Sequence, residues 1–168
     1  SILWIIRLIE IDQTHKAVFF DRDGVLNHLV KRDGSYYSPQ KIEDFQIVED
    51  ASVVVKQVKD LGYIAIVISN QPDIARGKLK QSELDKMTEL LHEQLSIDDV
   101  FYCTHDDDND SGCRKPAPGL FYIAQEKYNI DFKKSFMIGD TWKDVEAAKH
   151  AGITMILIRR DYNQELIA

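Results

Sequence analysis

Short, almost entirely apolar runs alternate along the chain with stretches in which apolar residues recur every three or four positions. The apolar runs cover residues 17–20, 63–68, 100–103, 136–138 and 153–158, and they predict strands buried on both faces. The helical stripes between them begin near residues 51, 82, 118 and 142. Strands that alternate with helices predict a doubly wound, Rossmann-like α/β fold, with a mostly parallel sheet of about five core strands and helices on both faces.

A few residues mark where these helices begin and end. Gly62 and Gly152 each follow an apolar stripe, and they predict helix ends in the left-handed conformation. Ser82 and Asp85 have the spacing of a capping box at the start of the second helix. Pro118 suits the first turn of the third helix.

The segment over residues 27–46 breaks this alternation. It is polar, and Asp33-Gly34 and Pro39 interrupt it, so we interpret it as a long loop. Long loops in compact domains are usually functional. Tyr36 and Tyr37 therefore either cover a site or pin the loop to the body of the domain.

Composition and charge narrow the class of protein. A chain of 168 residues with 44% hydrophobic residues predicts one soluble globular domain. The 28 acidic and 21 basic residues give a net charge of −7, which argues against a nucleic-acid partner or an anionic membrane surface. Two cysteines are too few for the disulfide framework of a secreted protein.

The first sixteen residues carry a separate apolar run, Ile2–Ile11, which is too short to span a bilayer. It lacks the features of a secretory signal, so we expect a cytoplasmic protein. We divide the chain into an N-terminal extension over residues 1–16 and a single domain over residues 17–168. The extension is an edge strand, a partner-binding segment or a cloning remnant. We expect a monomer, with an oligomer through residues 1–16 as the alternative.

Two carboxylates, Asp21 and Asp23, follow the first predicted strand directly. Side chains two residues apart on a strand point to the same side, so the two negative charges would lie close together and need a cation or a shared proton. The alternative is a simple turn at Asp23-Gly24. Because two close carboxylates need such a partner, we favour a reactive site over a turn.

Other polar residues follow the later predicted strands. In a parallel sheet, ligands bind at the carboxyl ends of the strands, so we expect one polar edge formed by Asp21, Asp23, Ser69, Asn70, Asp140 and Asp144. Carboxylates with a hydroxyl and a lysine suit Mg²⁺ and phosphate. In this arrangement Lys115 would neutralise phosphate oxygens, and Ser69 and Asn70 would donate hydrogen bonds to them. Asp140 would hold the metal, and Asp144 would orient a metal-bound water or Lys115.

Four short motifs stand in order along the chain: Asp21-Arg22-Asp23-Gly24, Ser69-Asn70, Lys115, and Gly139-Asp140 with Asp144. Together they resemble the motifs of the haloacid dehalogenase superfamily of phosphotransferases. The resemblance implies that Asp21 is the nucleophile, that Asp23 is the general acid/base, and that both join Asp140 as ligands of Mg²⁺. It also implies that Arg114 and Lys115 bind phosphate.

Two further segments narrow the resemblance within the superfamily. Residues 70–77, with Asn70, Gln71 and Arg76, and residues 113–119 resemble the nearly capless heptose-bisphosphate phosphatases, and histidinol-phosphate phosphatases share parts of both. This implies a minimal cap or none, and it adds Gln71 and Arg76 to the substrate contacts. Thr141 and Trp142 stand where such enzymes often carry a basic residue, so that phosphate contact is expected to be missing.

The implied activity is Mg²⁺-dependent hydrolysis of a phosphate monoester on a small sugar through an aspartyl phosphate. The implied substrate is D-glycero-D-manno-heptose 1,7-bisphosphate, dephosphorylated at position 7 on the way to lipopolysaccharide precursors. The alternatives are a histidinol-phosphate phosphatase, a phospho-acceptor signalling domain and a nucleic-acid end phosphatase. Asp23 argues against the signalling domain, and the net charge argues against the nucleic-acid enzyme.

The resembling enzymes carry a structural zinc in the loop where this chain has Cys103, His105 and Cys113. Ser111 stands in place of the fourth expected ligand, and serine replaces a thiolate poorly. Either an aspartate completes the site or the loop folds without metal. The candidate aspartates are Asp106, Asp107, Asp108 and Asp110.

Overall fold

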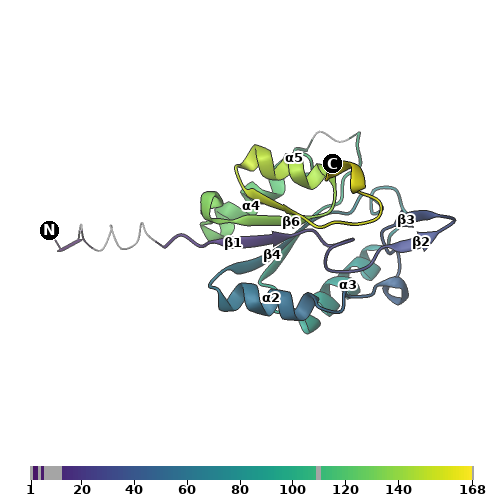
Figure 1. Ribbon diagram of the computed structural model, residues 1–168, viewed down its shortest axis with the longest axis horizontal. Helices are drawn as coiled ribbons and strands as arrows, with labels where there is room; N and C mark the ends of the chain where they lie inside the picture. The colour runs from purple at the N-terminus through teal and green to yellow at the C-terminus, as the bar shows by residue number, and fades with distance from the viewer. Residues whose placement is uncertain (1, 4, 6–12, 109–110, 168) are drawn as a thin grey trace.

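A five-stranded sheet forms the centre of the molecule in the computed structural model, which describes residues 2–3, 5, 13–108 and 111–167. All neighbouring strands are parallel, and their order is β5-β4-β1-β6-β7, with β1 in the middle (Figure 1). The strands are β1 (Ala17–Phe20), β4 (Ile64–Asn70), β5 (Asp99–Cys103), β6 (Phe136–Gly139) and β7 (Thr154–Leu157). The predicted doubly wound parallel sheet is therefore confirmed.

Helices cover both faces of this sheet. Helices α2 (Ala51–Asp60) and α3 (Gln81–Gln94) lie on one face, and α4 (Gly119–Tyr128) and α5 (Trp142–Ala151) lie on the other (Figure 1). The described residues also form the short 3₁₀ helices η1 (Ile42–Asp44), η2 (Phe132–Lys134) and η3 (Gln164–Leu166). Gly62 and Gly152 follow α2 and α5 with φ of 86° and 74°, so both predicted helix ends are confirmed.

The side chains of β1 divide the core into two layers. Val18 and Phe20 belong to the apolar cluster under α2 and α3, while Ala17 and Phe19 belong to the cluster under α4 and α5. Alternate residues of a strand point to opposite faces, and a strand covered on both faces must be apolar throughout. The uninterrupted apolar run of β1 follows from its central position.

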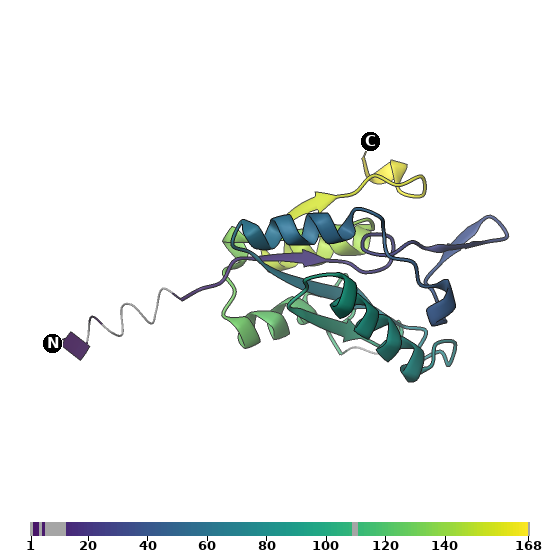
Figure 2. The ribbon, with the colours of Figure 1, turned by 90° about the horizontal axis from the view of Figure 1, so that it is seen from below.

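The segment over residues 27–46 contains structure that the sequence interpretation missed. Strands β2 (Val30–Arg32) and β3 (Ser35–Tyr37) form an antiparallel hairpin that projects beyond the carboxyl ends of the central strands (Figure 2). Asp33 and Gly34 form its turn with φ of 49° and 79°, the conformation that an Asp-Gly hairpin turn requires. The interpretation of this segment as one long loop is therefore wrong over the hairpin. The strands are short and largely exposed, which leaves no apolar alternation to detect in the sequence.

The prediction of a capping box at the start of α3 is also wrong. The helix begins after Lys80 with no side-chain cap, and Asp85 accepts a hydrogen bond from the Gln81 side chain at 2.8 Å. A capping box is found instead at α5, where the backbone N–H of Thr141 donates to Asp144 Oδ2.

The N-terminal run lies largely outside the described residues, so its interpretation and the domain division stay predictions. Residues 13–16 lead into β1, and His15 exchanges backbone hydrogen bonds with Asn129 and Asp131 at 2.9 and 2.8 Å. Among the described residues, no helix combines the length and the apolar character that crossing a membrane would require.

Candidate active site

A cavity of about 480 Å³ opens at the carboxyl ends of β1, β4 and β6. The predicted site residues that line it are Asp21, Asp23, Ser69, Asn70, Arg114, Lys115, Asp140 and Asp144. The parallel sheet brings the six residues at or just after strand ends together, as the strand-end rule predicts. The loop between β5 and α4 adds Arg114 and Lys115. Gln71 and Arg76 do not line this cavity, and they border a neighbouring one of about 530 Å³.

The buried ammonium group of Lys115 joins three elements at the floor of the cavity. Its Nζ donates to Asp21 Oδ1 at 2.9 Å, to Asp144 Oδ1 at 2.6 Å and to the Ile68 carbonyl at 3.0 Å. Burial lowers the pKa of Lys115, but the two carboxylates outweigh burial and raise it above its usual value, so the ammonium stays charged.

The side chain of Asn70 holds the backbone of Lys115. Its Nδ2 donates to the Lys115 carbonyl, and its Oδ1 accepts from the Lys115 N–H, both at 2.9 Å. These contacts occupy the Asn70 amide, so its effect on a bound phosphate would pass through Lys115. The Ser69 hydroxyl accepts a hydrogen bond from Gln71 Nε2 at 3.0 Å and borders the cavity.

Three buried carboxylates gather beside Lys115. Carboxylate oxygens of Asp21, Asp140 and Asp144 lie within 4.8 Å of one another. Burial, followed by the charge of Asp144, raises the pKa of Asp21, and burial also raises the pKa of Asp140. Three carboxylates facing one ammonium leave an excess of negative charge that a divalent cation would neutralise.

The donor groups fit Mg²⁺ at Asp21 and Asp140. Asp140 Oδ1 is buried and has no hydrogen-bond partner among the described residues, which is costly unless something else binds it. Both oxygens of Asp144 are already used, because Oδ1 accepts from Lys115 while Oδ2 accepts from Asp140 N and from the N–H and hydroxyl of Thr141. Hard oxygen ligands of this kind suit Mg²⁺.

The carboxylate of Asp23 stands apart from this cluster in a separate network. Oδ1 accepts from Arg22 Nε at 2.9 Å and from Asn27 Nδ2 at 3.0 Å, and Oδ2 accepts from Gln71 Nε2 at 2.9 Å. Burial alone would raise the pKa of Asp23, but Arg22 and these hydrogen bonds hold it below its usual value. The Gln71 amide is used here rather than at the cavity wall.

Arg22 is a residue that the sequence interpretation did not single out. Its side chain is fully buried, its Nη2 lies 2.8 Å from Asp23 Oδ1, and its guanidinium lies 5.3 Å from the Phe45 ring and 5.6 Å from the Tyr102 ring. A charged residue between two acidic site residues was the available signal. A buried arginine needs a carboxylate partner, and Asp23 supplies it.

Two expected substrate-binding arginines are paired with the acidic loop. Arg76 Nε and Nη2 each lie 2.6 Å from the Asp106 carboxylate, and Arg114 Nε donates to Asp107 Oδ1 at 2.7 Å. Hydrogen bonds from Arg76 lower the pKa of Asp106 to about 2. Two of the aspartates considered for a metal site are therefore engaged with arginines.

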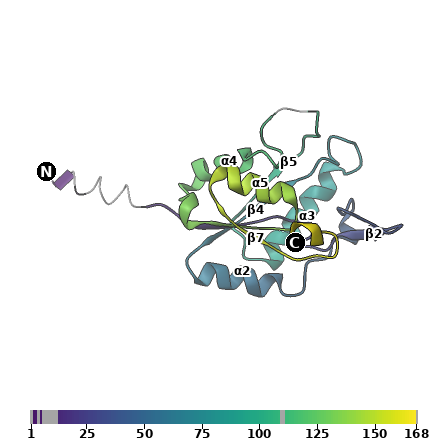
Figure 3. The ribbon, with the colours of Figure 1, turned by 45° about the horizontal axis from the view of Figure 1, so that its top comes forward.

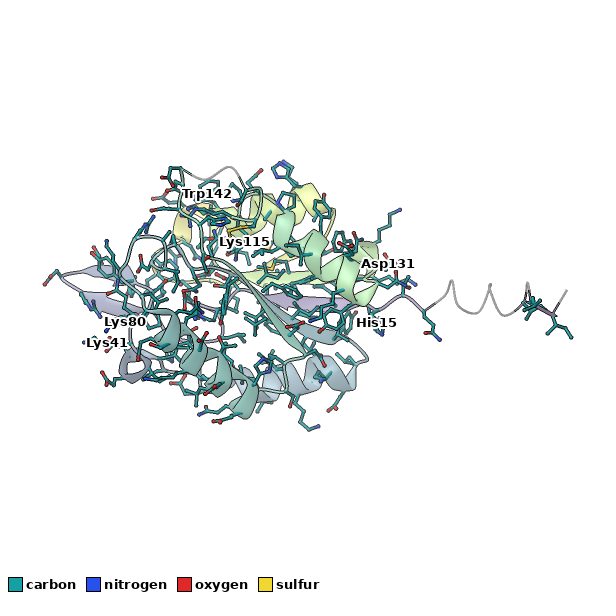
Figure 4. The ribbon with its side chains drawn as sticks, turned by 180° about the vertical axis from the view of Figure 1, so that it is seen from behind. His15, Lys41, Lys80, Lys115, Asp131 and Trp142 are labelled. Carbon is teal, nitrogen blue, oxygen red and sulfur yellow. A yellow bond between two sulfur atoms is a disulfide. The ribbon has the colours of Figure 1, made fainter. Side chains whose placement is uncertain are left out.

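Lys143 provides a cation that the sequence interpretation missed. The side chain lines the cavity beside Arg114, and it forms no ion pair with any residue that the structure describes. Burial and then the charge of Arg114 lower its pKa. Trp142 is 51% exposed and lies toward the outer edge beyond Lys115 (Figure 4). A basic residue, which the sequence interpretation expected to be missing here, lines the cavity one position later along α5.

Two aromatic side chains from distant parts of the chain complete the cavity wall. Tyr36 of the hairpin and Tyr162 near the C-terminus both line it, and their ring centres lie 5.2 Å apart. Tyr36 therefore borders the site, as one of the two interpretations predicted, whereas Tyr37 borders the neighbouring cavity and not this one. No motif marked Tyr162.

The loop after β5 brings the expected zinc ligands together. Cys103 and Cys113 form a disulfide, and His105 Nδ1 lies 3.5 Å from Cys113 Sγ. The Ser111 hydroxyl lies 2.8 Å from the same nitrogen. Asp110 lies outside the described residues.

Replacement of Gly24 by alanine should destabilise the protein more than the same change at Gly34. Both glycines have positive φ, 86° and 79°, so both changes introduce similar backbone strain, about 1–2 kcal/mol. A Cβ at Gly24 would lie 2.2 Å from Asp140 Oδ2 and 2.5 Å from Tyr162 Oη, whereas a Cβ at Gly34 meets nothing within 4 Å. Urea unfolding measures both variants. Equal losses of unfolding free energy in G24A and G34A would contradict this close packing.

Comparison with known proteins places this site in a family. Residues 112–166 match the HAD-hydrolase-like family model. D-glycero-alpha-D-manno-heptose-1,7-bisphosphate 7-phosphatase of Photorhabdus laumondii is 38% identical over 150 residues, which are 82% of this chain and 79% of that protein. The beta-anomer 7-phosphatase of Haemophilus ducreyi is 36% identical over 157 residues, covering 86% and 83% of the two chains.

Solved structures show the same fold. D,D-heptose 1,7-bisphosphate phosphatase from B. bronchiseptica, complexed with magnesium and phosphate, has a TM-score of 0.80 and 24% identity over 90% of this chain and 85% of that chain. The sequence relatives are phosphatases, which favours hydrolysis over a phospho-acceptor signalling role. The chain belongs to the D-glycero-D-manno-heptose-1,7-bisphosphate 7-phosphatase family of haloacid-dehalogenase-like hydrolases.

Proposed function

We propose that this phosphatase removes the 7-phosphate of D-glycero-D-manno-heptose 1,7-bisphosphate with Mg²⁺ bound at Asp21 and Asp140, in the synthesis of lipopolysaccharide precursors. The observation that most supports this proposal is the ion pair of Asp21 with Lys115 beside Asp140 Oδ1, which has no hydrogen-bond partner among the described residues. Bound Mg²⁺ would supply positive charge that neutralises phosphate oxygens. The relatives named above act on this sugar bisphosphate, which supports the choice of substrate.

Asp21 would attack phosphorus. Its Oδ1 is held by Lys115 and by the Arg22 N–H at 2.9 Å each, so the ammonium also stands beside the phosphate that Asp21 would attack. Attack forms a bond from Asp21 to phosphorus and breaks the bond from phosphorus to the sugar oxygen. Hydrolysis of the aspartyl phosphate then returns free Asp21 and inorganic phosphate.

Asp23 would move the protons in both steps. The sugar oxygen leaves with a proton from Asp23, and Asp23 later takes a proton from the water that attacks the aspartyl phosphate. The contacts with Arg22, Asn27 and Gln71 favour the ionised form that the second step requires. The first step requires the protonated form, so we infer that Asp23 leaves these partners before it protonates the sugar oxygen.

Two adjoining cavities support a substrate with two phosphates. Arg114, Lys115 and Lys143 line the catalytic cavity, and the neighbouring one carries three further cations, Arg32, Arg76 and Lys78. The walls share Tyr36, Ser38 and Pro72. A sugar bisphosphate carries about four negative charges near neutral pH, which this distribution of cations matches. A substrate with a single phosphate, such as histidinol phosphate, would bring no anion to this second group of cations, in which Arg32 pairs with Asp44 and Arg76 with Asp106.

A phosphate-release assay with both substrates tests the proposed reaction. We expect turnover of heptose 1,7-bisphosphate to exceed that of histidinol phosphate, and D21N to abolish it because the amide is a poor nucleophile. D85N on exposed α3 is the matched control and should keep wild-type turnover. Faster turnover of histidinol phosphate would show that it, and not the heptose bisphosphate, is the substrate. Near-normal activity of D21N would contradict the assignment of Asp21 as the nucleophile.

Lys143→Met should weaken binding of the bisphosphate. A lost charge-assisted contact with phosphate costs about 1.5–3 kcal/mol, so KM should rise about tenfold or more. The effect on kcat should be smaller if Lys143 contacts bound substrate and transition state alike. Lys56→Met removes an exposed lysine of α2 and serves as the control. Steady-state kinetics in which the two variants behave alike would exclude Lys143 from the site.

We also propose that the reduced loop binds Zn²⁺ through Cys103, His105 and Cys113. The three side chains are already close enough to ligate one ion, and Ser111 or water would complete four ligands. Such a metal would act only on the structure of the loop. Because a reduced compartment disfavours the disulfide, the predicted cytoplasmic location is consistent with this site. The cytoplasmic location and the monomeric state remain predictions.

Metal analysis of protein purified under reducing conditions tests this site. We expect about one zinc ion per chain and loss of zinc in C113S. Zinc should bind more tightly to S111C, because the new cysteine supplies a thiolate as the fourth ligand. Competition with a coloured chelator measures the affinities. Absence of zinc from both the wild type and S111C would exclude the site.

A further inference from the structure

After β7, the C-terminal segment over residues 158–163 returns to the active site. The N–H of Ile158 donates to the Gly139 carbonyl at 2.8 Å, and Arg160 Nε donates to the Gly24 carbonyl at 3.0 Å. The buried amide of Asn163 donates to the Asp140 carbonyl at 2.7 Å. This segment therefore fixes the backbone of both loops that carry the acidic cluster.

The side chain of Tyr162 extends this support to the carboxylate itself. Its hydroxyl donates a hydrogen bond to Asp140 Oδ2, while Asp140 Oδ1 is buried with no partner among the described residues. One oxygen is thus held and the other is free. A carboxylate restrained in this way loses less conformational freedom when a cation binds to its second oxygen.

The position of Tyr162 is in turn fixed from two sides. Its ring packs on Tyr36, which places the hairpin and the C-terminal segment side by side at the cavity (Figure 3). Gly24 permits this arrangement, because a Cβ there would meet both Asp140 Oδ2 and Tyr162 Oη. Such packing on both sides is what a side chain needs to hold another in one orientation.

We propose that Tyr162 is a positioning residue, whose hydroxyl holds one oxygen of Asp140 so that the other is presented to a divalent cation. This inference rests on the proposed function only in taking Asp140 as a Mg²⁺ ligand. The opposite arrangement is that the hydroxyl occupies the place of the cation and competes with it. The two arrangements predict opposite changes in metal affinity when the hydroxyl is removed.

Calorimetric titration of the substrate-free protein with Mg²⁺ distinguishes them. Tyr162→Phe removes the hydroxyl and keeps the ring that packs on Tyr36. We expect the dissociation constant for Mg²⁺ to rise about tenfold or more, which is the range for loss of a group that orients a metal ligand. Tyr122→Phe makes the same chemical change on exposed α4 and should leave the constant unchanged. Thermal unfolding of both variants without metal checks that they remain folded.

An unchanged or lower dissociation constant in folded Y162F would overturn the proposal, as would absence of Mg²⁺ binding by the wild type. A Y162F protein that is unfolded without metal would also overturn it, because the hydroxyl would then be needed for the fold. Metal titration requires no substrate, so failure of the wild type to release phosphate from heptose bisphosphate would disprove the proposed reaction and leave this result standing. At saturating Mg²⁺, turnover of Y162F should return toward the wild-type value.

Discussion

The ion pairs of one buried lysine connect most of the candidate site. Lys115 binds Asp21 at the end of β1, Asp144 at the start of α5, and the Ile68 carbonyl in β4. A buried ammonium is costly without partners, so the three elements must meet for the charge to be tolerated. The sheet places the strand ends together, and Lys115 fixes their side chains. The remaining negative charge of the cluster would favour binding of a divalent cation.

The sequence predicts the central fold well because burial dictates it. Strands covered on both faces must be apolar, so β1 and β4 stand out as uninterrupted runs, and glycine marks the ends of α2 and α5. The hairpin was missed because exposed strands carry no such pattern, although Asp33-Gly34 is a strong turn signal. The capping box was assigned to α3 instead of α5 because its spacing alone does not show which hydrogen bonds form.

The sequence likewise predicts some features of the candidate site and not others. Strand order explains why Asp21 and Asp140 meet, and the strand-end rule anticipates it from sequence. Lys115 lies in the loop between β5 and α4, and only its chemistry and the family resemblance indicated its place at the site. Sequence does not reveal how hydrogen-bonding capacity is shared, so Asn70 and Gln71 were expected at the phosphate while their amides bind Lys115 and Asp23. Tyr162 lies beyond the last motif, and only the return of the chain after β7 brings it to the site.

The link between Cys103 and Cys113 affects Lys115 through chain entropy. Cys103 ends β5, and Cys113 precedes Arg114 and Lys115 by one and two positions. Closing a loop across a sequence separation of 10 lowers the conformational entropy of the unfolded chain. The loss corresponds to about 2–3 kcal/mol of added stability, whether a disulfide or a metal closes the loop. The closure keeps Cys113 at the end of β5, and so shortens the segment that must be ordered for Lys115 to reach its partners. Any event that changes this link would therefore alter how well the lysine is organised before substrate arrives.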